Sequence, residues 1–230
     1  MMERKERHVL AVFPHPDDES FGKAGTFALY AQSGTPVTLI CGTLGQMGRN
    51  MGKPFFANRE TLPSIREKEL RDACDAIGIK DLRLLGLRDK TLEFEDPEEL
   101  ADRIEAVIRD TNPSLLVTYY PEHGVHPDHD ALSRAAVRAV ARLPKEQRPV
   151  VYGSAVTKNA REVLGEPDVV FDVTPVYEAK MAAIRAHRSQ SAAMLARVEE
   201  QSAQDPSVRE QWERTQRYES YWIYSVDEKN

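Results

Sequence analysis

The sequence predicts an α/β domain in which helices cover a mostly parallel sheet. Strand and helix signals alternate along the chain, and the strand segments are nearly continuous apolar runs, which is typical of strands buried on both faces. No linker rich in Pro or Gly divides the 230 residues. We therefore expect a single domain over residues 1–230, long enough to bury a core without disulfides.

Each element is predicted by a local signal. In chain order, strands are expected at 8–13, 36–41, 82–85, 114–120, 150–152, 169–173 and 221–226, and helices at 16–32, 64–77, 96–110, 128–143 and 174–198. Ser64 and Glu67 have the spacing of a capping box, and Gly78 is a typical residue after a helix end. Asp96 followed by Pro97 is a typical helix start.

Composition narrows the class of protein. The 31 basic and 37 acidic residues give a net charge of −6, which argues against a nucleic-acid partner. Cys41 and Cys74 are too few for a disulfide framework and indicate reduced thiols in a cytosolic protein. The longest uncharged stretch, residues 24–48, is interrupted by a turn at 32–36, so no membrane span is expected. The sequence leaves the oligomeric state open, a homo-oligomer included.

A short motif occurs twice, each time directly after a predicted strand. The first copy is His15-Pro16-Asp17-Asp18, and the second is His126-Pro127-Asp128-His129. Proline keeps the preceding residue extended and suits the first turn of a helix, so each copy lies just past the carboxyl end of a strand. Ligands bind at that edge of an open α/β sheet, so we expect one shared site.

The residue types of the two copies predict a metal site. His15, Asp18 and His129 offer two imidazoles and a carboxylate, and three protein ligands with one open position are typical of catalytic zinc. The same donor set suits non-haem iron(II), so the spacing does not choose between the metals. Taken alone, an aspartate such as Asp18 in this position is more often a helix N-cap.

The remaining residues of the motif suggest proton transfer. Asp17 is free to act as a general base on an attacking water. His126 is a candidate to stabilise an oxyanion and to protonate a leaving group. Asp128 is placed to orient a histidine, although it is also a plausible N-cap.

These motifs resemble those of the LmbE-like or PIG-L family of zinc-dependent N-acetylglucosaminyl deacetylases. The resemblance runs from His8 to about Gln190 and implies a Rossmann-like three-layer α/β sandwich. It also implies one zinc per chain and an amino-sugar substrate. The roles that it implies are zinc ligands at His15, Asp18 and His129, a base at Asp17, an acid or electrostatic role for His126, and tuning of a histidine by Asp128. Pro14 stands where the family usually has Ala.

Three further segments, 45–52, 66–70 and 86–90, are similar to the second-type deacetylases of bacillithiol biosynthesis. Gln46 stands where that group has Glu. The resemblance implies N-acetylglucosaminyl-malate as substrate. Arg49 on a glycine-rich loop and Arg66 early in a helix are then candidates to bind the malate carboxylates, since a guanidinium can hold a carboxylate through two hydrogen bonds. A solvated surface role for both arginines is the alternative.

Other interpretations stay open at this stage. His123 is a possible competing ligand, and His187 has the spacing of a core-facing residue in a segment, 186–190, that recurs in the family. One rival function is amidase action on bacillithiol S-conjugates. Another is a non-catalytic sugar- or nucleotide-binding Rossmann-like module, which would bind no metal and turn nothing over.

Overall fold

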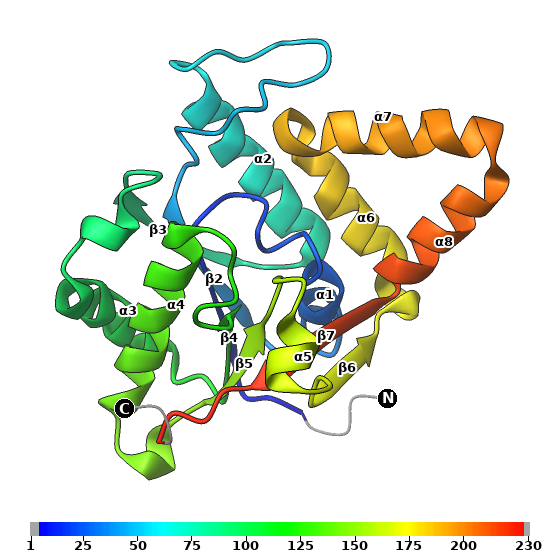
Figure 1. Cartoon of the computed structure of the whole chain (residues 1–230). Coiled ribbons are helices and arrows are strands. Elements are labelled where there is room, and N and C mark those ends of the chain that lie inside the picture. Colours follow the sequence, from blue (N-terminus) through cyan, green and yellow to red (C-terminus); the bar gives the residue numbers. More distant parts are fainter. Residues whose placement is uncertain (1–4, 228–230) are drawn as a thin grey trace.

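A twisted sheet forms the middle of the protein (Figure 1). The computed structural model describes residues 5–227, so the ends of the predicted domain lie outside it. Within these residues the sheet has seven strands, in the order β3(Asp81–Leu87), β2(Val37–Thr43), β1(Val9–Phe13), β4(Leu115–Tyr119), β5(Val150–Ser154), β7(Tyr218–Ile223) and β6(Val169–Asp172). The strands from β3 to β5 are parallel, and β7 is antiparallel to both neighbours. The predicted α/β class with a mostly parallel sheet is confirmed.

Helices cover both faces of the sheet and complete a three-layer sandwich. One face carries α1(Ala24–Gln32), α2(Leu62–Ile77) and α6(Tyr177–Ala186), and the other carries α3(Pro97–Thr111) and α4(Pro127–Ala141). Alternate residues of β1 serve the two cores: Phe13 packs in the first, and Val12 in the second. Within residues 5–227, no helix is both long and apolar enough to cross a membrane.

The remaining elements are short or peripheral. They are η1(Leu92–Phe94), η2(Lys145–Gln147), α5(Ala160–Leu164), η3(Thr174–Val176), α7(Arg188–Gln204) and α8(Pro206–Gln216). In Figure 1, α7 and α8 form an arm that extends from the end of α6 and returns to β7. Helix α8 buries none of its residues and was not predicted from the sequence.

The first predicted helix is wrong in its amino-terminal half. The helix begins at Ala24, and residues 14–23 form a loop of successive turns. Asp17 has φ +115° and Gly22 has φ +76°, and neither value fits a right-handed helix. The extra turns hold the first His-Pro-Asp motif at the edge of the sheet.

The capping box predicted for the second helix is also wrong. Helix α2 begins at Leu62, and Pro63 occupies its first turn, the place where a proline fits a helix. Ser64 therefore lies inside the helix, where its hydroxyl donates to the carbonyl of Thr61. The predicted end is correct, because Gly78 follows the helix with φ +94°.

The long helix predicted for residues 174–198 is broken in two. A 3-10 turn and α6 occupy the first part, and α7 begins at Arg188. His187 between them has φ −77° and ψ +54°, outside the helical region. No Pro or Gly marks this break, and the His187 side chain there contacts Glu19, 168 positions away in the sequence.

A buried carboxylate ties the last strand to the first helix. Glu219 of β7 is 2% exposed and accepts from the backbone amides of Gly25 and Thr26 at 3.0 and 2.7 Å. A carboxylate suits the positive end of the α1 dipole. The ammonium of Lys180 lies 2.9 Å from the same carboxylate and is also buried. A side chain at Gly25 would collide with Val173, so only glycine lets the start of α1 pack this closely against Val173.

Glu219→Gln should therefore destabilise the protein strongly. The change leaves the Lys180 ammonium buried without its carboxylate partner, and breaking such a pair costs about 3–5 kcal/mol. Denaturant unfolding measures the free energy of unfolding. Glu213→Gln is the matched control, because Glu213 forms a partly exposed pair with Arg217 at 3.8 Å. Equal losses in the two variants would contradict the prediction.

Candidate metal centre and active site

The two His-Pro-Asp motifs meet at one edge of the sheet. They follow β1 and β4, which pair in parallel from Val9 with Leu115 onward. The chain builds β2 and β3 on one side of β1, then continues with β4 and β5 on the other. This reversal of strand order is the point at which open α/β sheets bind ligands.

Three donor side chains converge there. One ligand atom from each of His15, Asp18 and His129 lies within 4.8 Å of the others. The Nδ1 atom of His15 is 3.2 Å from the Nε2 atom of His129. The Oδ2 atom of Asp18 lies 3.5 Å from Nδ1 of His15, and its Oδ1 atom lies 3.4 Å from Nε2 of His129. This set fits a divalent ion that keeps one coordination position open.

Outer contacts fix two of these donors. The Nδ1 atom of His129 lies 2.7 Å from the carbonyl oxygen of Gly124, so in the neutral ring Nδ1 carries the proton and Nε2 the lone pair. Tyr119 stacks on the same ring at 4.1 Å and donates its hydroxyl to Asp18 at 2.6 Å. A Cβ atom at Gly124 would lie 2.5 Å from the Cβ of His129, so glycine is required here.

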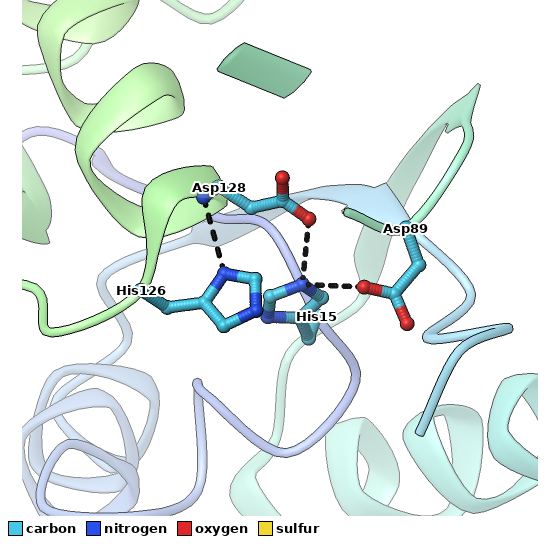
Figure 2. A group of neighbouring side chains, drawn as sticks. All are labelled: His15, Asp89, His126 and Asp128. Atoms are coloured by element: carbon cyan, nitrogen blue, oxygen red, sulfur yellow. Dashed lines mark hydrogen bonds and ion pairs between the residues drawn. The ribbon is translucent and has the colours of Figure 1, made fainter. Parts of the chain in front are cut away.

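His15 is held from its other side. Its Nε2 atom lies 3.1 Å from Asp128 and 3.2 Å from Asp89, as Figure 2 shows. Asp128 is fully buried and also accepts from the backbone amides of Lys90 and Leu92. In the neutral ring, donation from Nε2 leaves the lone pair on Nδ1, which faces His129 and Asp18. A carboxylate behind a ligating histidine is a common outer contact in metal sites.

Buried charges set the protonation of these groups. Burial disfavours charge on His15, but hydrogen bonds to Asp128, Asp18 and Asp89 outweigh it and raise the pKa of His15 well above its ordinary value. Burial also disfavours the Asp18 carboxylate, but His129 and His15 outweigh it and lower the pKa of Asp18. The cluster thus keeps its carboxylate ionised.

A second group of four side chains could also hold a metal. His15, Asp89, His126 and Asp128 bring one ligand atom each within 4.8 Å (Figure 2). These side chains already bond to protein groups: Asp89 accepts from the Met47 amide at 2.7 Å, and the Nδ1 atom of His126 accepts from the Asp128 amide at 3.1 Å. We therefore favour the first cluster as the metal site and regard the second as the support of His15.

Asp17 lies beside the cluster in an unusual conformation. Its carboxylate accepts from Arg66 at 3.1 Å, and its backbone amide donates to Glu19 at 3.0 Å. Burial raises the pKa of Asp17 to about 6, and the positive charge of Arg66 opposes the rise. A carboxylate with this pKa is ionised at neutral pH yet basic enough to accept a proton, as a general base requires.

His126 is the N-cap of α4, the position for which Asp128 was an alternative. Its Nδ1 atom accepts a backbone hydrogen bond, so the neutral ring carries its proton on Nε2. The ring centre lies 5.0 Å from that of His15 and 5.2 Å from that of His129. His126 can therefore present a proton donor beside the cluster.

The two arginines predicted to bind substrate lie in different environments. Arg49 is exposed on the loop after β2. Arg66 is 4% exposed, and its guanidinium donates to Asp17 and to the carbonyls of Pro16 and Gly45. Sequence reasoning expected Arg66 to bind a substrate carboxylate; the structure adds a carboxylate of the protein itself, Asp17, as a partner of its guanidinium.

Two other histidines lie outside the donor clusters. His123 contacts the hydroxyl of Thr157 at 2.6 Å, and His187 contacts Glu19 at 2.6 Å. Sequence reasoning missed Asp89 and Tyr119 as site residues. Both lie at or just after the carboxyl end of a strand, which is the signal that could have identified them.

This fold and site define an α/β protein with a His/Asp centre able to hold a metal ion at the switch point of its sheet. The family model described as GlcNAc-PI de-N-acetylase (PIG-L) matches residues 10–140. The chain belongs to this family.

Relatives in sequence agree with that assignment, and a solved structure shares the fold. The chain is 64% identical over 190 residues to "Probable N-acetyl-alpha-D-glucosaminyl L-malate deacetylase 2" of Bacillus cereus, covering 83% of this chain and 86% of the relative. It is 55% identical over 219 residues to the Bacillus subtilis protein of the same name, covering 95% and 98%. N,N'-diacetylchitobiose deacetylase of Pyrococcus horikoshii shares the fold, with a TM-score of 0.69 and 22% identity over 96% of this chain and 85% of that one.

Metal content should separate the two clusters. Asp18→Asn and His129→Ala remove donors of the first cluster, so we expect elemental analysis of the purified variants to show little zinc. Asp17→Asn should retain about one ion per chain, because Asp17 contributes no donor to either cluster. Zinc retained by Asp18→Asn but lost from Asp89→Asn would place the ion in the second cluster instead.

Proposed function

We propose that this protein is a zinc-dependent deacetylase that removes the acetyl group of N-acetylglucosaminyl-malate in bacillithiol biosynthesis. The observation that carries the proposal is the three-donor cluster with Asp17 beside it, in a chain 64% identical to a relative named for this activity. A non-catalytic binding module has no need of a base next to a ligand set. A bacillithiol S-conjugate amidase would use the same chemistry on another amide and is the nearest alternative.

His15, Asp18 and His129 would hold the ion. A bound zinc supplies Lewis acidity, which polarises the acetamide carbonyl and lowers the pKa of water from 15.7 to roughly 7. Iron(II) suits the same donors. Asp128 and Tyr119 keep the ligands oriented from behind.

The other residues act on protons. Asp17 takes a proton from the attacking water while Arg66 holds its carboxylate in place. His126 donates a hydrogen bond from Nε2 to the oxyanion that forms at the carbonyl and keeps that proton, which is the only one on its neutral ring. The proton that Asp17 took from water passes to the leaving amine, which returns Asp17 to its carboxylate form. A carbon–oxygen bond forms and the carbon–nitrogen bond breaks. The products are acetate and the free amino sugar.

We extend the proposal to the domain, the cellular compartment and the partners of the reaction. We assign residues 1–230 to one deacetylase domain acting on a small amino sugar in the cytosol. Cys41 and Cys74 are both buried free thiols, which suits a reducing compartment. Neither a nucleic acid nor a membrane takes part.

Acetate release from N-acetylglucosaminyl-malate tests the proposal. We expect chelation of the metal to abolish release and zinc to restore it. Asp17→Asn should keep its zinc and lose about 10²–10⁴ in kcat, the usual contribution of a positioned general base. Full activity of the metal-free protein would refute the mechanism, and faster cleavage of bacillithiol S-conjugates would favour the amidase.

Arginine variants test the substrate and separate the two arginines. The malate group brings carboxylates to an acidic protein, and exposed Arg49 can bind one of them. Hydrogen bonds to charged groups contribute about 1.5–3 kcal/mol, so Arg49→Ala should raise KM for the malate substrate roughly 10- to 150-fold. The same change should matter little for N-acetylglucosamine, which has no carboxylate.

Arg66→Ala should behave differently if Arg66 holds Asp17. We expect kcat to fall by a similar factor with the malate substrate and with N-acetylglucosamine. A rise in KM confined to the malate substrate would instead support the substrate-binding role expected from the sequence. Equal turnover of both sugars by the unmodified protein would argue against the malate assignment.

A further inference from the structure

We infer that His187, far from the motifs in sequence, is a positioning residue for the proposed deacetylation and acts on Asp17 through Glu19. This inference rests on the proposed function. His187 lies at the junction of α6 and α7, and its side chain is fully buried. It belongs to neither donor cluster, so it cannot serve as a ligand of the ion.

Two consecutive hydrogen bonds connect His187 to the base. The Nε2 atom of His187 lies 2.6 Å from one carboxylate oxygen of Glu19. The other oxygen of Glu19 accepts from the backbone amide of Asp17 at 3.0 Å. His187 therefore fixes the Glu19 carboxylate, and this carboxylate fixes the backbone of the base.

Asp17 needs such support because its backbone is strained. A φ of +115° is a conformation that side chains other than glycine rarely adopt, and it persists only where the surroundings impose it. Glu19 holds the amide of Asp17, and Arg66 holds its carboxylate. If the first contact is lost, Asp17 can relax to a commoner conformation and move its carboxylate away from the cluster.

The junction itself is anchored to α2, the helix that carries Arg66. The backbone amide and hydroxyl of Ser189 both donate to Glu69 of α2, at 2.7 and 2.6 Å. Gln190 donates to the carbonyl of Asn50 in the loop after β2 at 3.3 Å. Arg66, which contacts Asp17 directly, and His187, which contacts it through Glu19, thus belong to segments that are hydrogen-bonded to each other.

The imidazole is not placed for packing alone. Among residues 5–227, the Nδ1 atom of His187 has no hydrogen-bond partner, although it is buried. Buried polar atoms are rarely left in this state, and one that is left calls for an explanation. One nitrogen of the ring, Nδ1, makes no hydrogen bond, while the other, Nε2, contacts Glu19. This arrangement fits a role in orienting Glu19 better than a role in packing the core.

Paired substitutions test this role. His187→Leu keeps the bulk of the side chain and removes the donor, whereas His187→Gln keeps an amide N–H that can reach Glu19. We expect His187→Leu to lower kcat by about 10- to 100-fold, since a misplaced catalytic group can cost ~10²-fold. KM and zinc content should stay unchanged, and His187→Gln should recover most of kcat. His8→Leu is the control, because His8 also makes a side-chain hydrogen bond, to Thr38, but lies just before the amino end of β1.

A double-mutant cycle with Asp17→Asn decides whether His187 acts through the base. If it does, His187→Leu should cost little further activity once Asp17 is Asn, because groups that act as a unit are not additive. A full loss in that background, loss of zinc, or failure of His187→Gln to recover activity would overturn the inference. If His187→Leu does not fold, Glu19→Gln takes its place in the cycle. The ratios can be measured on any N-acetyl sugar that the unmodified protein deacetylates, so they stand apart from the choice of malate as substrate.

Discussion

The parallel pairing of β1 with β4 is the constraint on which the site depends. These strands are separated by about a hundred residues in sequence, yet they are neighbours in the sheet, with Val9 opposite Leu115. Their pairing brings His15 and Asp18, in the loop after β1, close to His129, which follows β4. The helices on both faces bury these strands completely, so the spacing of the three donors is fixed by the core rather than by the loops themselves.

Three consecutive acidic residues have three different tasks because the loop after β1 changes direction at each of them. Asp18 turns toward the histidines and Tyr119, and Asp17 turns toward Arg66. Glu19 is fully buried and turns inward to His187. A helix or a strand would distribute these side chains by a fixed repeat, whereas the positive φ of Asp17 breaks the repeat. The strained backbone thus lets one short segment supply the proposed ligand, the proposed base and the support of that base.

Local patterns in the sequence were sufficient for part of this description. The apolar runs predicted the strands, and the two His-Pro-Asp motifs predicted which residues would share an edge, because both depend on neighbours in the chain. The start of α1 and the break at His187 could not be predicted in this way. Each depends on a contact between distant segments: His187 bonds to a residue 168 positions away, and Arg66 to one 49 positions away. The burial of Arg66 has the same origin, since only the folded loops after β1 and β2 enclose its guanidinium.

The position of β7 has a consequence for folding during synthesis. This strand lies between β5 and β6, and it is the only partner of β6 among residues 5–227. Its Glu219 also caps α1, which follows the first motif. A ribosome makes residues 218–223 after every other strand described, so β6 has no sheet to join and α1 lacks its cap until then. The nascent chain can pair β1 to β5 early, but it must protect an open sheet edge at β5 until nearly the whole protein has been made.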